Sequence, residues 1–221
     1  MQVEESYQRY LDKVEKNGLN DNASTDRGRF VRLRNENANI FVQLIIGKKT
    51  TNNHRYIQNL LVSDKKISVS KKRSLTYDFE LPKDYFDLAN VYAKASQGEC
   101  SNKNIYLFEI KEENKNEIIQ DDFHKPSFLA REAPYTITSD SINVFYDDFK
   151  VDSLYTSYYR YPTQIRLIDT SDSDSKFNES FQTDFDDQTE DIILSLCAGQ
   201  FALNNSDPMH QALQQNAITK I

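Results

Sequence analysis

Apolar residues recur every three or four positions through the first 63 residues, a spacing typical of amphipathic helices. One helix is predicted over 3–17, where Gly18 follows the last apolar position. A longer helix is predicted over 26–46, ended by Gly47, and a shorter one over 53–63. The first part of the chain is therefore predicted to be helical.

Asn37 interrupts the apolar stripe of the second predicted helix. A lone buried Asn can fix the register of packed helices. An Asn at the rim of the stripe would contact solvent instead, and the pattern favours this second interpretation. We therefore expect Asn37 at the edge of the helix interface.

Short β-rich runs separated by polar turns replace the helical pattern over about 66–168. Several runs alternate apolar and polar residues, and prolines stand at run boundaries, where a missing N–H does no harm. Ser139 and Asp140 separate two of these runs and predict a two-residue hairpin turn. This part of the chain is predicted to form a sheet.

Helical spacing returns near the end of the chain. A helix is predicted over 184–205, and Asp207-Pro208 predicts the start of another. This order indicates an α+β fold: a helical bundle formed by the N- and C-terminal helices, with an inserted antiparallel β-sheet region. The expected divisions are N-terminal helices in 1–65, a β-rich insertion in 66–168, and C-terminal helices in 169–221 that pack with the N-terminal ones.

The helix predicted over 184–205 carries apolar residues on two sides. Several lie within about 40° of Phe185 on a helical wheel, whereas Leu194 and Phe201 lie near the opposite side. A surface helix needs only one apolar stripe, so the second must be covered by another layer of this chain or by another chain. In a chain this polar, we favour another chain. Leu194 and Phe201 are therefore candidate interface residues.

Composition and charge narrow the class of protein. The 221 residues are 38% hydrophobic and 28% charged, and the 13 Tyr and 13 Phe argue against general disorder. The net charge of −7 makes a general nucleic-acid binder a poor fit. Residues 1–75 hold 15 Lys and Arg against 8 Asp and Glu, whereas the remainder holds 12 against 26. The basic third either faces an acidic surface of a partner or neighbouring copy, or is an ordinary solvated face.

Membrane, secretory and disulfide-rich classes are disfavoured. No apolar run approaches the ~18 residues that span a bilayer, and the acidic, polar start is unlike a secretory signal. Cys100 and Cys197 are expected to be free thiols in a reducing compartment.

No motif in the chain predicts a catalytic, cofactor or metal site. The histidines lack ligands at metal-binding spacing, and the loop 169–180 fails the calcium pattern at Lys176. No glycine-rich phosphate loop or nucleophile motif occurs. The acidic residues from Asp184 to Asp191 could serve acid–base chemistry, but anionic residues that stabilise a helix N-terminus explain them better. We expect no enzymatic activity.

The stretch "YTSYYRYP" (155–162) is dense in aromatic residues. Stacking on nucleic-acid bases is one interpretation. A Tyr-rich strand or a protein–protein contact is favoured, because Tyr and Arg are both common at interfaces. Tyr158, Tyr159 and Arg160 are therefore further candidate interface residues.

The order of several segments resembles that of the head–tail connector (adaptor or ring) proteins of tailed, short-tailed-type bacteriophages. The segments that carry this resemblance are "DRGRFVRLRNENANIFVQ", "LPKDYF", "HKPSFLAREAPYTITSDSINVFY", "YYRYPTQI" and "FQTDFDDQTEDIILSLCAGQFAL". Together they span most of residues 25–215.

The resemblance implies a structural virion protein that is assembled in the host cytoplasm and forms a homo-oligomeric ring, commonly of twelve copies. Such a ring bridges the portal protein and other tail or ring proteins, and surrounds the channel through which genomic DNA passes without sequence-specific binding. It implies no cofactor and no membrane. The alternative is a small nucleic-acid- or protein-binding module that uses the aromatic stretch 155–161.

Overall fold

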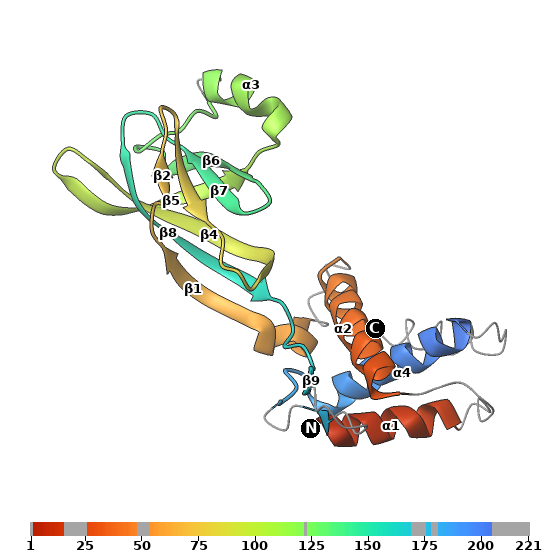
Figure 1. The fold of residues 1–221 in the computed structure, drawn as a ribbon. Coiled ribbons are helices and arrows are strands. Elements are labelled where there is room, and N and C mark those ends of the chain that lie inside the picture. Colours follow the sequence, from red (N-terminus) through yellow and green to blue (C-terminus); the bar gives the residue numbers. More distant parts are fainter. Residues whose placement is uncertain are drawn as a thin grey trace. The chain divides into compact units, whose positions relative to one another are not determined.

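The computed structural model describes residues 2–15, 26–47, 54–121, 123–168, 176–177 and 181–204 (Figure 1). The chain divides into two compact units. The helical unit comprises Met1–Leu60 and Tyr161–Ile221, and the β unit comprises Leu61–Arg160. The predicted α+β class is confirmed. The sheet begins earlier than the predicted residue 66, because the chain enters a strand at Leu61.

The described residues of the helical unit form three long helices. They are α1 (Val3–Glu15), α2 (Arg27–Gly47) and α4 (Asp187–Asn204), and α4 packs against both of the others. The helix predicted over 53–63 is instead the 3₁₀ helix η1 (His54–Leu60), and it passes directly into strand β1. A two-stranded sheet of β9 (Leu167–Ile168) and β10 (Lys176–Phe177) completes the described part of this unit.

Aromatic rings from α1, α2 and the C-terminal segments form the core of the helical unit. Tyr10 and Phe30 lie with their ring centroids 5.2 Å apart, and Phe30 lies 5.9 Å from Phe177. The ring centroid of Phe41 on α2 lies 6.0 Å from that of Phe185, which precedes α4. These residues come from both ends of the chain, so the two ends fold together around one core.

One eight-stranded sheet dominates the β unit, in the order β1-β8-β4-β5-β6-β7-β3-β2 (Figure 1). The strands are β1 (Leu61–Ile67), β2 (Lys71–Lys72), β3 (Thr76–Glu80), β4 (Tyr85–Gln97), β5 (Cys100–Glu109), β6 (Glu132–Ile137), β7 (Ser141–Phe145) and β8 (Lys150–Arg160).

The sheet is mixed, which corrects the prediction of an antiparallel region. β5 and β6 pair in parallel, with Tyr106 opposite Glu132. Parallel neighbours need a long crossover. Here it contains the 3₁₀ helix η2 (Glu112–Asn114) and helix α3 (Lys115–Gln120). The other pairings of this sheet are antiparallel, and the hairpin predicted at Ser139-Asp140 is confirmed between β6 and β7.

The sheet of the β unit encloses its own core. Alternate positions of six strands supply buried side chains to it, as expected for strands with one face inward. They include Phe79, Ala93, Ile105, Ala133, Val144 and Leu154. Two sequence interpretations lie outside the described residues: the last helix, predicted to start at Asp207-Pro208, and the greater part of the loop 169–180, for which a calcium pattern was rejected.

Candidate protein-interaction surface

Leu194 and Phe201 lie in the interior of their own helical unit, so the prediction that another chain covers them is wrong. Both side chains are 0% exposed. The ring of Phe201 meets Tyr10 of α1 edge-on at 6.3 Å, and the guanidinium of Arg29 on α2 lies 4.2 Å from its centroid. α4 is thus covered by α1 and by α2, which explains why it is apolar on two sides.

A buried ion pair joins α2 to α4. The Arg34 guanidinium donates two hydrogen bonds to the Glu190 carboxylate, at 3.1 and 2.9 Å, and the two side chains are 1% and 0% exposed. Arg34 also donates to the Thr183 hydroxyl at 3.0 Å, which in turn donates to Glu190 at 2.7 Å. The Thr163 carbonyl accepts a further bond from Arg34 at 3.3 Å. These hydrogen bonds compensate for the loss of hydration of the buried Arg34 guanidinium.

Asn37 is also buried, which corrects its predicted place at the rim of the helix. Its amide donates to the Leu33 carbonyl at 2.8 Å and to the Gln200 side chain of α4 at 2.6 Å. The second bond links α2 to α4, so Asn37 is the polar contact inside the helix interface that the sequence pattern disfavoured.

The acidic segment before and within α4 has structural roles. Asp186 precedes the helix, and its carboxylate accepts the Thr189 N–H at 2.7 Å, as an N-cap does. Asp184 accepts the Thr163 N–H at 2.7 Å. Asp191 pairs with Lys13 of α1 at 2.8 Å, and Glu190 is the partner of Arg34. The Asp186 bond agrees with the helix-start interpretation, whereas Asp184, Glu190 and Asp191 contact other segments of the helical unit.

The aromatic stretch on β8 is mostly packed inside the β unit. Tyr158 is fully buried. Its hydroxyl donates a hydrogen bond to the Asp84 carboxylate at 3.0 Å and accepts one from the Lys65 ammonium at 3.2 Å. Tyr159 is also buried. The candidate interface role of these two tyrosines is therefore wrong, because both side chains are buried within the chain itself. Arg160 is partly exposed at the end of β8, and its role stays a prediction.

Two large apolar side chains that the sequence analysis did not single out face solvent between α3 and β6. Phe123 is 90% exposed and Leu129 is 85% exposed. We call residues 123–131 the apolar turn segment. Single exposed apolar residues are common, but two almost fully exposed ones six residues apart on a short connection are not.

Asp121 organises the first turn of this segment. Its backbone carbonyl accepts the N–H groups of His124 and Lys125 at 3.1 and 2.8 Å. Its carboxylate accepts the Phe123 N–H at 3.0 Å and lies 2.6 Å from His124 Nδ1. These two bonds, the Phe123 one first, hold the pKa of Asp121 below its usual value. Phe123 is thus held outward by a hydrogen-bonded turn.

A second closed turn presents Leu129. The backbones of Ser127 and Glu132 exchange hydrogen bonds at 2.8 and 3.2 Å, and the Ser127 hydroxyl accepts the Ala130 N–H at 3.1 Å. Arg131 closes the turn with a φ of 63°, a conformation that non-glycine residues rarely adopt. The exposed leucine therefore stands on a constrained backbone.

Other classes of site gain no support from the described residues. Nowhere in that part of the chain do three His, Cys, Asp or Glu side chains gather as metal ligands do. None of its helices has the length and apolar character needed to cross a bilayer. Cys100 and Cys197 are both free thiols, the first exposed and the second buried.

Comparison of the sequence with protein-family models and with curated proteins gave no match.

Proposed function

We propose that the protein is a structural, non-enzymatic component of a tailed-phage virion, a connector that forms a homo-oligomeric ring at the head–tail junction. In this role it bridges the portal protein and further tail or ring proteins around the DNA exit channel. The order of sequence segments motivates the phage assignment. The apolar turn segment is the observation on the molecule that supports an assembling protein.

Two nearly bare apolar side chains on preformed turns favour a protein contact. Burying a Phe or Leu side chain contributes about 1.5–3 kcal/mol each. The turns around Phe123 and Leu129 are already closed by backbone hydrogen bonds, so little conformational entropy remains to be lost on binding. Burying these apolar side chains in an intersubunit contact is favourable, and the preformed turns lose little conformational entropy on binding.

A ring requires contacts between different surfaces of identical copies. The apolar turn segment supplies one such surface, in place of α4, whose two sides are both covered within the protomer. The excess of basic residues in 1–75 over the acidic remainder provides complementary charge for neighbouring copies or stacked rings.

Light scattering of the chain mixed with the portal protein from the same source tests the proposal. The wild type should form a complex of many copies, and Phe123→Ser with Leu129→Ser should stay monomeric with an unchanged circular dichroism spectrum. Leu75→Ser is the matched control, because Leu75 is another exposed apolar residue of the β unit, 54% exposed. Wild-type chains that remain monomeric with portal, or a double variant that assembles normally, would overturn the proposal.

A second candidate function rests on a row of tyrosines across three neighbouring strands. Tyr155 of β8 pairs with Tyr92 of β4, which pairs with Tyr106 of β5. The first two rings stack at 5.1 Å with an interplanar angle of 4°, and the Lys94 ammonium lies 5.2 Å from the Tyr155 ring. Aromatic rings beside a cation form the kind of platform that binds single strands.

Fluorescence anisotropy of a labelled oligothymidine separates this candidate from the first. Binding that weakens with salt and is lost in Tyr106→Ala would support the nucleic-acid module. No binding at low salt would leave the connector as the sole candidate.

A further inference from the structure

Strands β4 and β5 separate part-way along the sheet and leave a fork. β4 pairs with β8 from Tyr85 to Ser96, but its pairing with β5 starts only at Tyr92. From Tyr106 onward β5 pairs with β6 on its other side. Within the described strands, the facing edges of β4 before Tyr92 and of β5 after Tyr106 therefore have no strand partner.

Irregular pairing bends β4 at this place. Its register with β8 shifts between Tyr85 and Asp87 and again between Leu88 and Asn90. Each bulge adds bending and twist to a strand. Two bulges within six residues carry β4 away from β5, so the opening is built into the strand and is not a packing defect.

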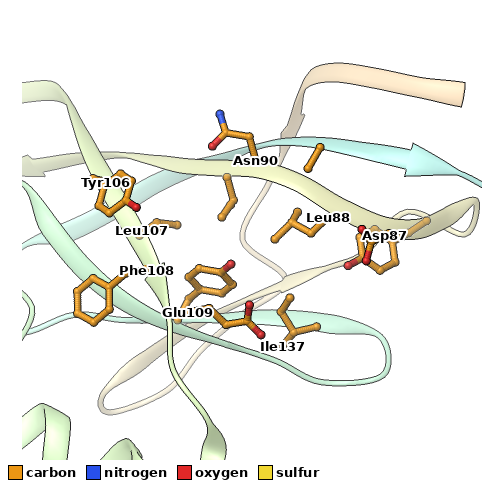
Figure 2. A pocket seen from close by; sticks show the side chains of 12 residues that line it. Asp87, Leu88, Asn90, Tyr106, Leu107, Phe108, Glu109 and Ile137 are labelled. Carbon is orange, nitrogen blue, oxygen red and sulfur yellow. The ribbon is translucent and has the colours of Figure 1, made fainter. Parts of the chain in front are cut away.

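A cavity of about 400 Å³ lies in the fork between β4 and β5. Figure 2 shows Asp87 and Leu88 of β4 on one side of it, and Leu107 and Glu109 of β5 on the other. β6 supplies the remaining wall. The lining residues are Tyr85, Asp87, Leu88, Ala89, Asn90, Val91, Tyr106, Leu107, Phe108, Glu109, Tyr135 and Ile137.

The cavity is negatively charged, and none of its lining residues is a cation. Burial raises the pKa of Asp87, a hydrogen bond from the Leu88 backbone N–H partly offsets this, and the nearby Glu109 carboxylate also raises the pKa. No ion pair to Asp87 or Glu109 is found among the described residues. The protein thus places two carboxylates beside one cavity without a positive charge to balance them.

Tyr135 of β6 lines the same cavity. Its side chain is only 5% exposed. Burial, and then the charge of Glu109, raises the pKa of its hydroxyl. Burial likewise raises the pKa of Tyr85 to about 12.

We propose that the fork between β4 and β5 binds a lysine or arginine side chain carried by an extended segment of a partner polypeptide. Asp87 and Glu109 pair with the cation, the faces of Tyr85 and Tyr135 lie beside it, and the Tyr135 hydroxyl completes its polar contacts. The open edges of β4 and β5 hydrogen-bond the backbone of the segment, as in other cases of strand addition.

The open strand edges favour a polypeptide over a free small cation, because a free amine would leave the backbone groups of the fork unused. The two carboxylates disfavour nucleic acid, whose phosphates they repel. The proposal concerns the β unit alone and does not depend on ring formation, so it can fail while the proposed function holds, and the reverse.

Isothermal titration of the full chain with extended pentapeptides that carry a central Arg or Lys tests this binding. The matched ligands replace Arg by citrulline, which keeps the side-chain length without the charge, and Lys by norleucine, which keeps the four-carbon side chain and lacks the ammonium group. We expect roughly tenfold or greater weakening with these neutral ligands. Free argininamide is a further ligand and should bind more weakly than the peptides.

Three variants locate the site. Asp87→Asn with Glu109→Gln should abolish the preference for the charged peptide, and Tyr135→Phe should weaken binding while its ring stays in the core. Glu99→Gln, an exposed acid of the same hairpin outside the cavity, should bind as the wild type does. Peptides that bind no better than their neutral counterparts, argininamide that binds as tightly as the peptides, or a Glu99 effect equal to that at the fork would overturn the proposal.

Discussion

The Arg34–Glu190 pair gives the sharpest prediction about stability. Replacing Glu190 by Gln keeps the size of the side chain and removes its charge, so the Arg34 guanidinium stays buried without a counter-ion. Two hydrogen bonds from Arg34 and one from Thr183 end on this carboxylate, and both charged side chains are at most 1% exposed. Removing one partner of such a pair costs about 3–5 kcal/mol. We expect Glu190→Gln to destabilise the helical unit by that amount.

Urea unfolding followed by circular dichroism at about 222 nm measures this loss, because the long helices are in the helical unit. The double variant Arg34→Met with Glu190→Leu removes both charges and should be much more stable than the sum of its single changes predicts. A loss below about 1 kcal/mol in Glu190→Gln would refute the buried pair. Additive losses in the double variant would show that the two side chains are not coupled.

Three further predictions concern other single groups. Burial raises the pKa of Asp87 above 3.8, so the ionised carboxylate destabilises the folded protein at neutral pH. Asp87→Asn should therefore raise the melting temperature at neutral pH. The gain should vanish near pH 3, where the carboxyl group is protonated in both the folded and the unfolded protein. Iodoacetamide should modify native Cys100 and spare Cys197, whose thiol is buried and has a raised pKa, as intact mass would show. Asp186→Ala should cost about 0.5–2 kcal/mol in urea unfolding through loss of the α4 cap, and no loss would contradict that role.

Local periodicity was sufficient to predict α1, α2 and α4, because each helix carries its own apolar spacing. It was not sufficient at residues 61–63, where pairing of β1 with β8 overrides a short helical pattern. The parallel pairing of β5 with β6 also depends on a long-range contact across the segment that contains α3, which local spacing does not reveal.

The sequence predicts the two apolar sides of α4 correctly, but the second side is covered by helices of the same chain and not by another chain. A helical wheel shows that a side chain such as Leu194 must be covered and does not show by what. The polar composition favoured another chain, yet α1 and α2 both pack against α4 within the same protomer, and the polar groups Arg34 and Glu190 at this interface are buried and paired.

The exposed turn segment escaped sequence analysis for a similar reason. Phe123 stands alone in a polar stretch and Leu129 adjoins Phe128, and in sequence such residues look the same whether they pack inward or face solvent. The fork cavity was equally hidden, because Asp87 and Glu109 come from strands that the fold brings together.

Negative-stain electron microscopy of the full chain assembled with its portal protein tests the proposed ring most directly. We predict class averages with rotational symmetry for the wild type, and isolated particles without symmetry for the Phe123→Ser, Leu129→Ser variant. Wild-type samples without symmetric particles, or a variant that forms the same annular particles, would contradict a connector built through the apolar turn segment.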